Sequence, residues 1–102
     1  MKKNSDQFEI LRAIDKKSNI TQRELSNSLG FSLGKINYCL GALKEKGFIK
    51  INNFSKSENK IKYAYILTPK GISEKTKLTY NFLKLKMKEY EDLQKEIKKT
   101  KK

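Results

Sequence analysis

Histidine and tryptophan are absent from this 102-residue sequence, and cysteine and proline occur once each. Without histidine the chain lacks the commonest general base and a frequent zinc ligand, so catalytic triads and zinc sites built on histidine are excluded. A single cysteine, Cys39, cannot form an intramolecular disulfide. The sequence also shows no paired nucleophile and base and no phosphate-cradling glycine loop. We therefore expect no catalytic residues, no metal, no cofactor and no enzymatic activity.

Long hydrophobic runs are also missing from the sequence. No apolar stretch approaches the roughly 20 residues that a membrane-spanning helix needs, so we expect no membrane partner and a soluble, cytoplasmic protein. Hydrophobic residues nevertheless make up 36% of the chain, which is enough for a globular core. A chain of this length suits one domain with an appendage.

Acidic residues are few, and the formal net charge is +13. Such an excess of positive charge favours a polyanionic partner, because lysine and arginine neutralise phosphates and release condensed counterions. All basic residues except Arg12 and Arg23 are lysines, however, and this bias also arises in proteins of A/T-rich genomes. The net charge alone therefore does not decide whether the partner is a nucleic acid.

Two helices are predicted in the first third of the chain. Apolar residues at helical spacing predict the first over residues 6–17. After a possible short strand at Ile20, Thr21 and Glu24 form a capping-box pattern that predicts the start of a second, short helix. Gly30 then suits the left-handed conformation that ends a helix, and Ser32 suits the cap of the next. The pattern is that of a helix-turn-helix.

A third helix is predicted over residues 32–46, with Gly47 as its stop. Its apolar stripe, which we expect to be buried, consists of Leu33, Ile36, Leu40 and Leu43. Cys39 lies at the border of this stripe, and we expect it to be a structural, partly buried residue. The alternative is a redox-sensing thiol, which requires exposure and a lowered pKa.

Small residues surround one aromatic residue on the opposite face of the third helix. Tyr38 lies almost opposite the stripe, near Gly34, Gly41 and Ala42. A glycine inside a helix costs about 1 kcal/mol relative to alanine, and close approach to another surface is one reason to keep it. Such a face would enter a DNA major groove deeply. The alternative is that Tyr38 packs on a neighbouring segment.

A two-stranded hairpin is predicted after Gly47. Residues 48–51 and 61–67 have β-rich, partly alternating composition, and the polar stretch 52–60 between them is turn-prone. Three helices followed by a hairpin give the order of elements in a winged helix. Lysines near the hairpin tip would lie along a DNA backbone or in a minor groove. The alternative is a solvated loop.

A long fourth helix begins at Thr68 and Pro69, which supply a cap and a first-turn proline, and extends to about Lys98. It is too long to fold back on so small a core. We predict that it mediates homodimerisation, because coiled-coil spacing of three and four residues relates Tyr80, Leu83, Met87, Tyr90, Gln94 and Ile97. A second stripe beside it contains Leu78, Phe82 and Leu85. The alternative is that all these residues pack within one chain.

The region from Ile20 to Gly71 resembles a MarR-type winged helix. The resemblance lies in the order and spacing of five strings: Thr21-Gln22-Arg23-Glu24-Leu25, Leu29-Gly30, Ser32, Leu43-Lys44-Glu45-Lys46-Gly47-Phe48-Ile49-Lys50 and Leu67-Thr68-Pro69-Lys70-Gly71. Within that family the chain is most similar to the short exopolysaccharide-associated MarR regulators, which also pair this domain with one long C-terminal helix.

The resemblance implies a DNA-binding dimer whose recognition helix is Ser32–Lys44 and whose wing is Asn52–Lys62. Many members carry an Asp-x-Arg motif in the wing, and this chain has Asn59 and Ile61 at the matching positions. The residues that we predict to contact DNA are Ser32, Gly34, Lys35, Asn37, Tyr38, Lys44, Lys56, Lys60 and Lys62.

The sequence thus predicts a mainly α fold with a small β-hairpin. Residues 1–71 would form a winged helix-turn-helix DNA-binding domain, and residues 72–102 a dimerisation helix with a basic tail. The expected partners are double-stranded DNA and a second copy of the chain, with no small-molecule ligand. The expected function is that of a bacterial, nucleoid-associated transcriptional regulator, repressor rather than activator. Alternatives are a protein-interaction module and a nucleic-acid-binding protein without sequence preference.

Overall fold

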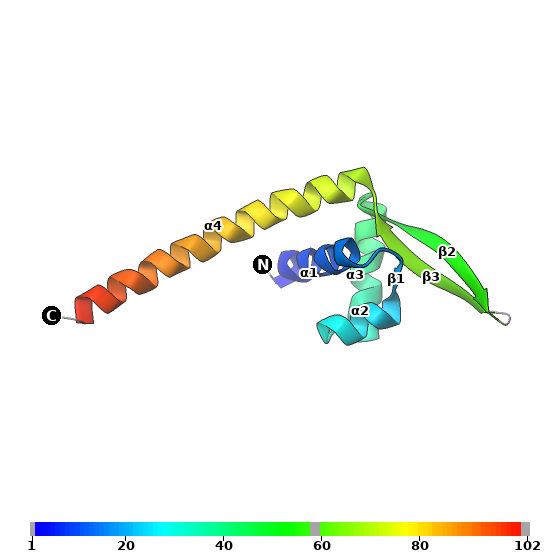
Figure 1. Cartoon of the computed structure of the whole chain (residues 1–102), viewed down its shortest axis with the longest axis horizontal. Helices are drawn as coiled ribbons and strands as arrows, with labels where there is room; N and C mark the ends of the chain where they lie inside the picture. The colour runs from blue at the N-terminus through cyan, green and yellow to red at the C-terminus, as the bar shows by residue number, and fades with distance from the viewer. Residues whose placement is uncertain (1, 58–59, 101–102) are drawn as a thin grey trace.

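Five longer elements and one very short strand precede a final long helix in the computed structural model (Figure 1). The structure describes the backbone of residues 2–57 and 60–100 and the side chains of residues 5–52 and 63–100. The elements are α1 (Lys2–Lys16), β1 (Ile20–Thr21), α2 (Gln22–Leu29), α3 (Leu33–Glu45), β2 (Ile49–Ser57), β3 (Lys60–Leu67) and α4 (Pro69–Thr100). The predicted fold class and order of elements are confirmed.

Local capping signals set the limits of α2 and α3. Thr21 is the N-cap of α2 and forms the predicted capping box with Glu24. Gly30 ends α2 in the left-handed conformation with φ 72°, which glycine adopts without strain. Ser32 caps α3 by accepting a hydrogen bond from the amide of Lys35. Thr21 thus fixes the start of α2, and Gly30 and Ser32 fix the turn between the two helices.

The start of α1 was predicted too late, at Asp6, whereas the helix begins at Lys2. Polar residues such as Asn4 and Ser5 favour a helix start but do not force one. No proline or glycine occurs among residues 2–6, so nothing in the sequence prevents the helix from extending toward the N-terminus.

The sheet is antiparallel, with strand order β1-β3-β2. Both hairpin strands are longer than predicted, because β2 extends to Ser57 and β3 begins at Lys60, inside the stretch predicted as a polar turn. Ladder hydrogen bonds join backbone groups, so polar side chains do not end a hairpin while both strands continue. A register irregularity between Phe54 and Lys56 interrupts the pairing.

The core lies where α1, α2 and α3 pack against one another and the sheet. The largest side chains that are almost fully buried are Ile10, Leu11, Ile14, Leu25, Ile36 and Leu43. Leu33 was predicted to belong to this core but is 47% exposed. Phe31, in the turn before α3, packs against the core instead. The apolar stripe of α3 therefore begins at Ile36.

The first half of α4 packs on α1, and the rest of α4 extends into solvent (Figure 1). The rings of Phe8 and Phe82 stack with centroids 4.7 Å apart. Lys75 pairs with Asp15 at 2.8 Å. Helix α4 has 32 residues, or about 48 Å at the usual rise, and every residue after Phe82 through Thr100 is exposed. The molecule consequently measures 69 × 25 × 20 Å.

Candidate nucleic-acid interface

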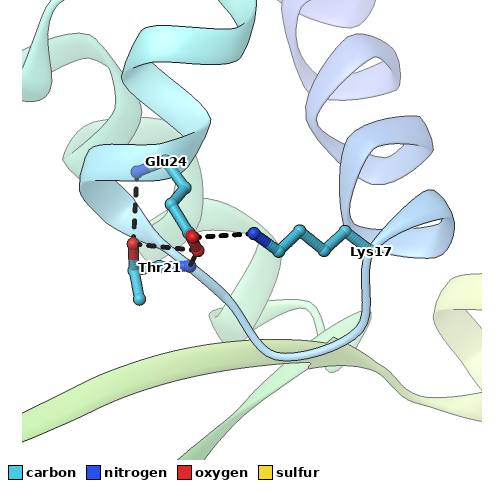
Figure 2. A network of polar contacts seen from close by, with 3 residues as sticks. All are labelled: Lys17, Thr21 and Glu24. Atoms are coloured by element: carbon cyan, nitrogen blue, oxygen red, sulfur yellow. Dashed lines mark hydrogen bonds and ion pairs between the residues drawn. The ribbon is translucent and has the colours of Figure 1, made fainter.

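The N-terminus of α2 is fixed by three polar side chains, which Figure 2 shows. The Glu24 amide donates to Thr21 Oγ1 at 3.1 Å, and the Thr21 amide donates to Glu24 Oε1 at 2.9 Å. Lys17 Nζ, at the end of α1, donates to Glu24 Oε2 at 2.7 Å. The Lys17 hydrogen bond is the largest cause that lowers the pKa of Glu24. The network holds the first helix of the helix-turn-helix in place.

The outer face of α3 is open, and its aromatic side chain is accessible. Tyr38 is 65% exposed and Asn37 is exposed beside it. A Cβ atom added at Gly34 or Gly41 would meet nothing within 4 Å. These glycines therefore leave space that no part of the described chain fills. This exposure counts against the alternative that Tyr38 packs on a neighbouring segment.

Lys35, one of the predicted DNA contacts, is directed toward α1. Its ammonium lies 2.9 Å from Asp6 Oδ2 and 4.2 Å from the centroid of the Phe31 ring. The pair is partly exposed, so solvent screens it. Lys35 can reach a phosphate only by leaving Asp6, and its contact with DNA stays a prediction.

The structure describes the side chains of only some of the remaining predicted DNA contacts. Ser32 and Lys44 are exposed at opposite ends of α3, and the Ser32 hydroxyl is engaged in the cap. Lys56, Lys60 and Lys62 lie outside the residues whose side chains are described. Their part in DNA binding is therefore a prediction from the sequence.

The structure has a shallow groove between α2 and β3 that was not predicted from the sequence. It is lined by Thr21, Gln22, Arg23, Glu24, Asn27, Tyr63 and Tyr65. Arg23 is exposed and Tyr63 is 55% exposed, so both present polar ends at the side of the helix-turn-helix. The capping box does locate Arg23 in the first turn of α2. Only the register of β3 places Tyr63 beside it.

The predicted dimerisation residues form an exposed face on α4. Tyr80, Leu83, Met87, Tyr90 and Ile97 are each between 52% and 63% exposed. Gln94 donates a hydrogen bond to the Tyr90 hydroxyl at 3.2 Å. Of the second stripe, Leu78 and Phe82 are partly buried and Leu85 is 53% exposed. The exposure of the seam residues counts against the alternative that all of them pack within one chain.

Within the described ranges, no three His, Cys, Asp or Glu side chains are grouped so that they could hold a metal ion. None of the helices in the described part of the chain has an apolar stretch long enough to cross a bilayer.

Residues 7–50 match the family model described as winged helix-turn-helix DNA-binding. This part of the chain is thus similar to a winged helix-turn-helix. The match begins in α1 and ends in β2, so it includes the whole helix-turn-helix. No curated protein matches the sequence.

Solved structures of MarR proteins share this arrangement. MarR from Staphylococcus aureus, in complex with salicylate and kanamycin, is 25% identical with a TM-score of 0.67, and the match covers 85% of this chain and 57% of that one. A mutant MarR from Escherichia coli, complexed with operator DNA, is also 25% identical with a TM-score of 0.64, covering 72% of this chain and 51% of that one. The chain therefore spans little more than half the length of these MarR proteins.

A PadR-like transcriptional regulator from Bacillus cereus matches over more of its own length. Its TM-score is 0.77 at 22% identity, with 86% of this chain and 90% of that chain covered. At this identity the match shows a shared fold. The chain thus shares its fold with solved structures of transcriptional regulators.

Proposed function

We propose that the chain is a sequence-specific transcriptional regulator that binds double-stranded DNA as a homodimer and represses transcription. The observation that carries the proposal is the outer face of α3. Asn37 and Tyr38 are exposed there between Gly34 and Gly41, around which the described chain leaves open space. A helix with so little side-chain bulk can lie deep in a major groove and present polar groups to base edges.

The basic character of the chain supplies the sequence-independent part of binding. A net charge of +13 attracts the phosphate backbone, and neutralised phosphates release counterions. In the proposed complex the wing lies on the backbone or in the adjacent minor groove. Arg23, in the first turn of α2, would add a phosphate contact from the other side of the groove.

The exposed seam of α4 supports the dimer. Two-fold proteins place two recognition helices about one DNA turn apart, roughly 34–36 Å, so dimerisation suits a two-fold symmetric site. The seam residues point into solvent in the single chain, and a second α4 is the simplest apolar partner for them.

We further propose that DNA binding needs no small-molecule ligand and that the chain acts by binding, without catalysis. The MarR of Staphylococcus aureus was solved with salicylate and kanamycin. In this chain Phe8 and Phe82 line the groove between α1 and α4, and their rings stack on each other, so that each ring already has an aromatic partner.

The second candidate function is a protein-interaction module. It is favoured by the exposed apolar face of α4, which would suit another protein as well as a second copy. In that case the lysines would serve solubility alone.

The proposed function is tested by selecting bound fragments from a pool of random duplex DNA with the full-length chain. We expect enrichment of one two-fold symmetric motif, and a binding constant that falls steeply with salt, since log K decreases linearly with log salt concentration for phosphate contacts. Enrichment of no motif, or binding that barely responds to salt, would favour the protein-interaction module.

A further inference from the structure

The first turn of α3 exposes a large apolar side chain beside the proposed DNA contact. Leu33 is 47% exposed, whereas Ile36 in the same helix is fully buried. The Gln22 side-chain amide donates to the Leu33 carbonyl at 3.2 Å, which ties this residue to the first turn of α2. Single exposed leucines are common on protein surfaces, so exposure alone gives Leu33 no role.

No unpaired lysine or arginine lies in the first two turns of α3. Lys35 is the one basic residue among positions 33–40, and it is held between Asp6 and the ring of Phe31. The commonest specific contact to guanine is made by arginine or lysine to its N7 and O6 atoms. This part of α3 therefore lacks a free side chain of the kind that usually reads a G·C pair.

The side chains that are present suit an A·T pair. Leu33 and Asn37 are four residues apart and lie on the same flank of α3. In the major groove thymine presents a C5-methyl group, which apolar side chains contact, and adenine presents N6 and N7, which an asparagine amide matches. Leucine and asparagine one turn apart are thus complementary to thymine and adenine.

We infer that α3 reads an A·T step in the major groove and that Leu33 is a specificity-determining residue, packing against the methyl group of a thymine. Asn37 lies beside it and faces an adenine. The inference rests on the proposed function and specifies the base pairs that its recognition helix selects. Burial of one methyl group is worth about fourfold in affinity, and this is the discrimination expected between thymine and the same base without its methyl.

Deoxyuridine supplies the probe, since it pairs like thymidine and lacks only the methyl group. The duplex selected with the full-length chain is resynthesised with each thymidine replaced in turn by deoxyuridine. We expect affinity to fall about fourfold at one thymidine, or one in each half-site, and to be unchanged at the others.

Three variants assign the effect to Leu33. Leu33→Ala should bind the thymidine and deoxyuridine duplexes equally, because the apolar contact is gone. Leu33→Met should keep the preference, because the side chain remains long and apolar. Ile72→Ala is the matched control, since Ile72 is 50% exposed and lies on α4, outside the proposed interface. Circular dichroism establishes that all three variants are folded.

The outcomes separate this inference from the proposed function. If a motif is enriched but no thymidine shows the methyl effect, or if Leu33→Ala retains it, the inference about Leu33 is wrong while sequence-specific binding stands. If no motif is enriched, both the inference and the proposed function fail. A preference lost in Leu33→Ala and kept in Leu33→Met and Ile72→Ala supports the inference.

Discussion

Individual residues at the proposed DNA interface have competing partners within the chain. Lys35 is the clearest case, because the side chain predicted to contact DNA is paired with Asp6 of α1. The pair offsets the positive charge at the start of α3. Asp6 thereby weakens the attraction of this surface for phosphates at short range, while the rest of the chain remains strongly basic.

Replacing Asp6 with asparagine should strengthen DNA binding. Lys35 is then free to contact a phosphate, and the slope of log K against log salt should become steeper by about one unit. The matched control is Asp15→Asn, which removes a carboxylate from a similar ion pair, Lys75–Asp15, between α1 and α4. Binding titrations over a range of salt concentrations measure both. Equal slopes for the two variants would show that Lys35 gains no DNA contact.

Cys39 should behave as a small apolar residue. It is 6% exposed, and burial is the largest cause that raises the pKa of its thiol. The negative charge of Asp6 raises this pKa further. A protonated, buried thiol reacts poorly with oxidants. Cys39→Ala should therefore cost about 1 kcal/mol of unfolding free energy. DNA binding by the parent protein and by Cys39→Ala should be equally insensitive to peroxide. Peroxide that abolishes binding by the parent protein but not by Cys39→Ala would identify a sensor.

At the level of elements, features set by local sequence signals were predicted better than features set by contacts between distant residues. Thr21, Gly30 and Ser32 set the helix-turn-helix through interactions with neighbours in sequence, and all three were predicted correctly. The exposure of Leu33 depends on Phe31 taking the place beside the core. The pairing of Lys35 with Asp6 depends on how α1 packs against α3. Neither follows from helical spacing alone.

The hairpin shows the same limit. Composition located both strands, but their length is set by backbone pairing between residues that are polar in sequence. The groove with Arg23 and Tyr63 joins elements 40 residues apart by numbering, and only the register of β3 against β1 brings them together.

Two glycines should respond in opposite ways to substitution by alanine. A Cβ at Gly71 would collide with the backbone carbonyl of Phe48, where α4 begins against the end of α3 and β2. Gly71→Ala should cost about 3 kcal/mol. Gly41→Ala meets open space and should stabilise α3 by up to about 1 kcal/mol. Chemical unfolding followed by circular dichroism compares the two, and equal effects would contradict the packing described for Gly71.

On the scale of the whole molecule, α4 makes a small winged helix into an elongated particle. Every residue of its distal half through Thr100 is exposed, and so is its apolar seam. Helices of this kind bury their seam against another helix. The dimer and the two-fold DNA site are thus linked in the proposed function.

Leu83→Glu should convert the dimer to a monomer at micromolar concentration, because a carboxylate buried at a helix seam loses its hydration without gaining a partner. Asn81→Glu is the matched control, since Asn81 is exposed on α4 but lies away from the seam. Light scattering on the full-length proteins gives the masses. A parent protein that is already monomeric, or two variants with the same mass, would contradict dimerisation through this face.

The proposed function depends on the outer face of α3 reading DNA bases. The most direct test measures the affinities of Asn37→Ala and Tyr38→Ala for the selected site and for random duplex DNA. Each variant, shown to be folded, should lose about 1–3 kcal/mol on the selected site and almost nothing on random DNA, because base contacts are lost while phosphate contacts remain. Folded variants that keep full affinity and full sequence preference would contradict the assignment of α3 as the recognition helix.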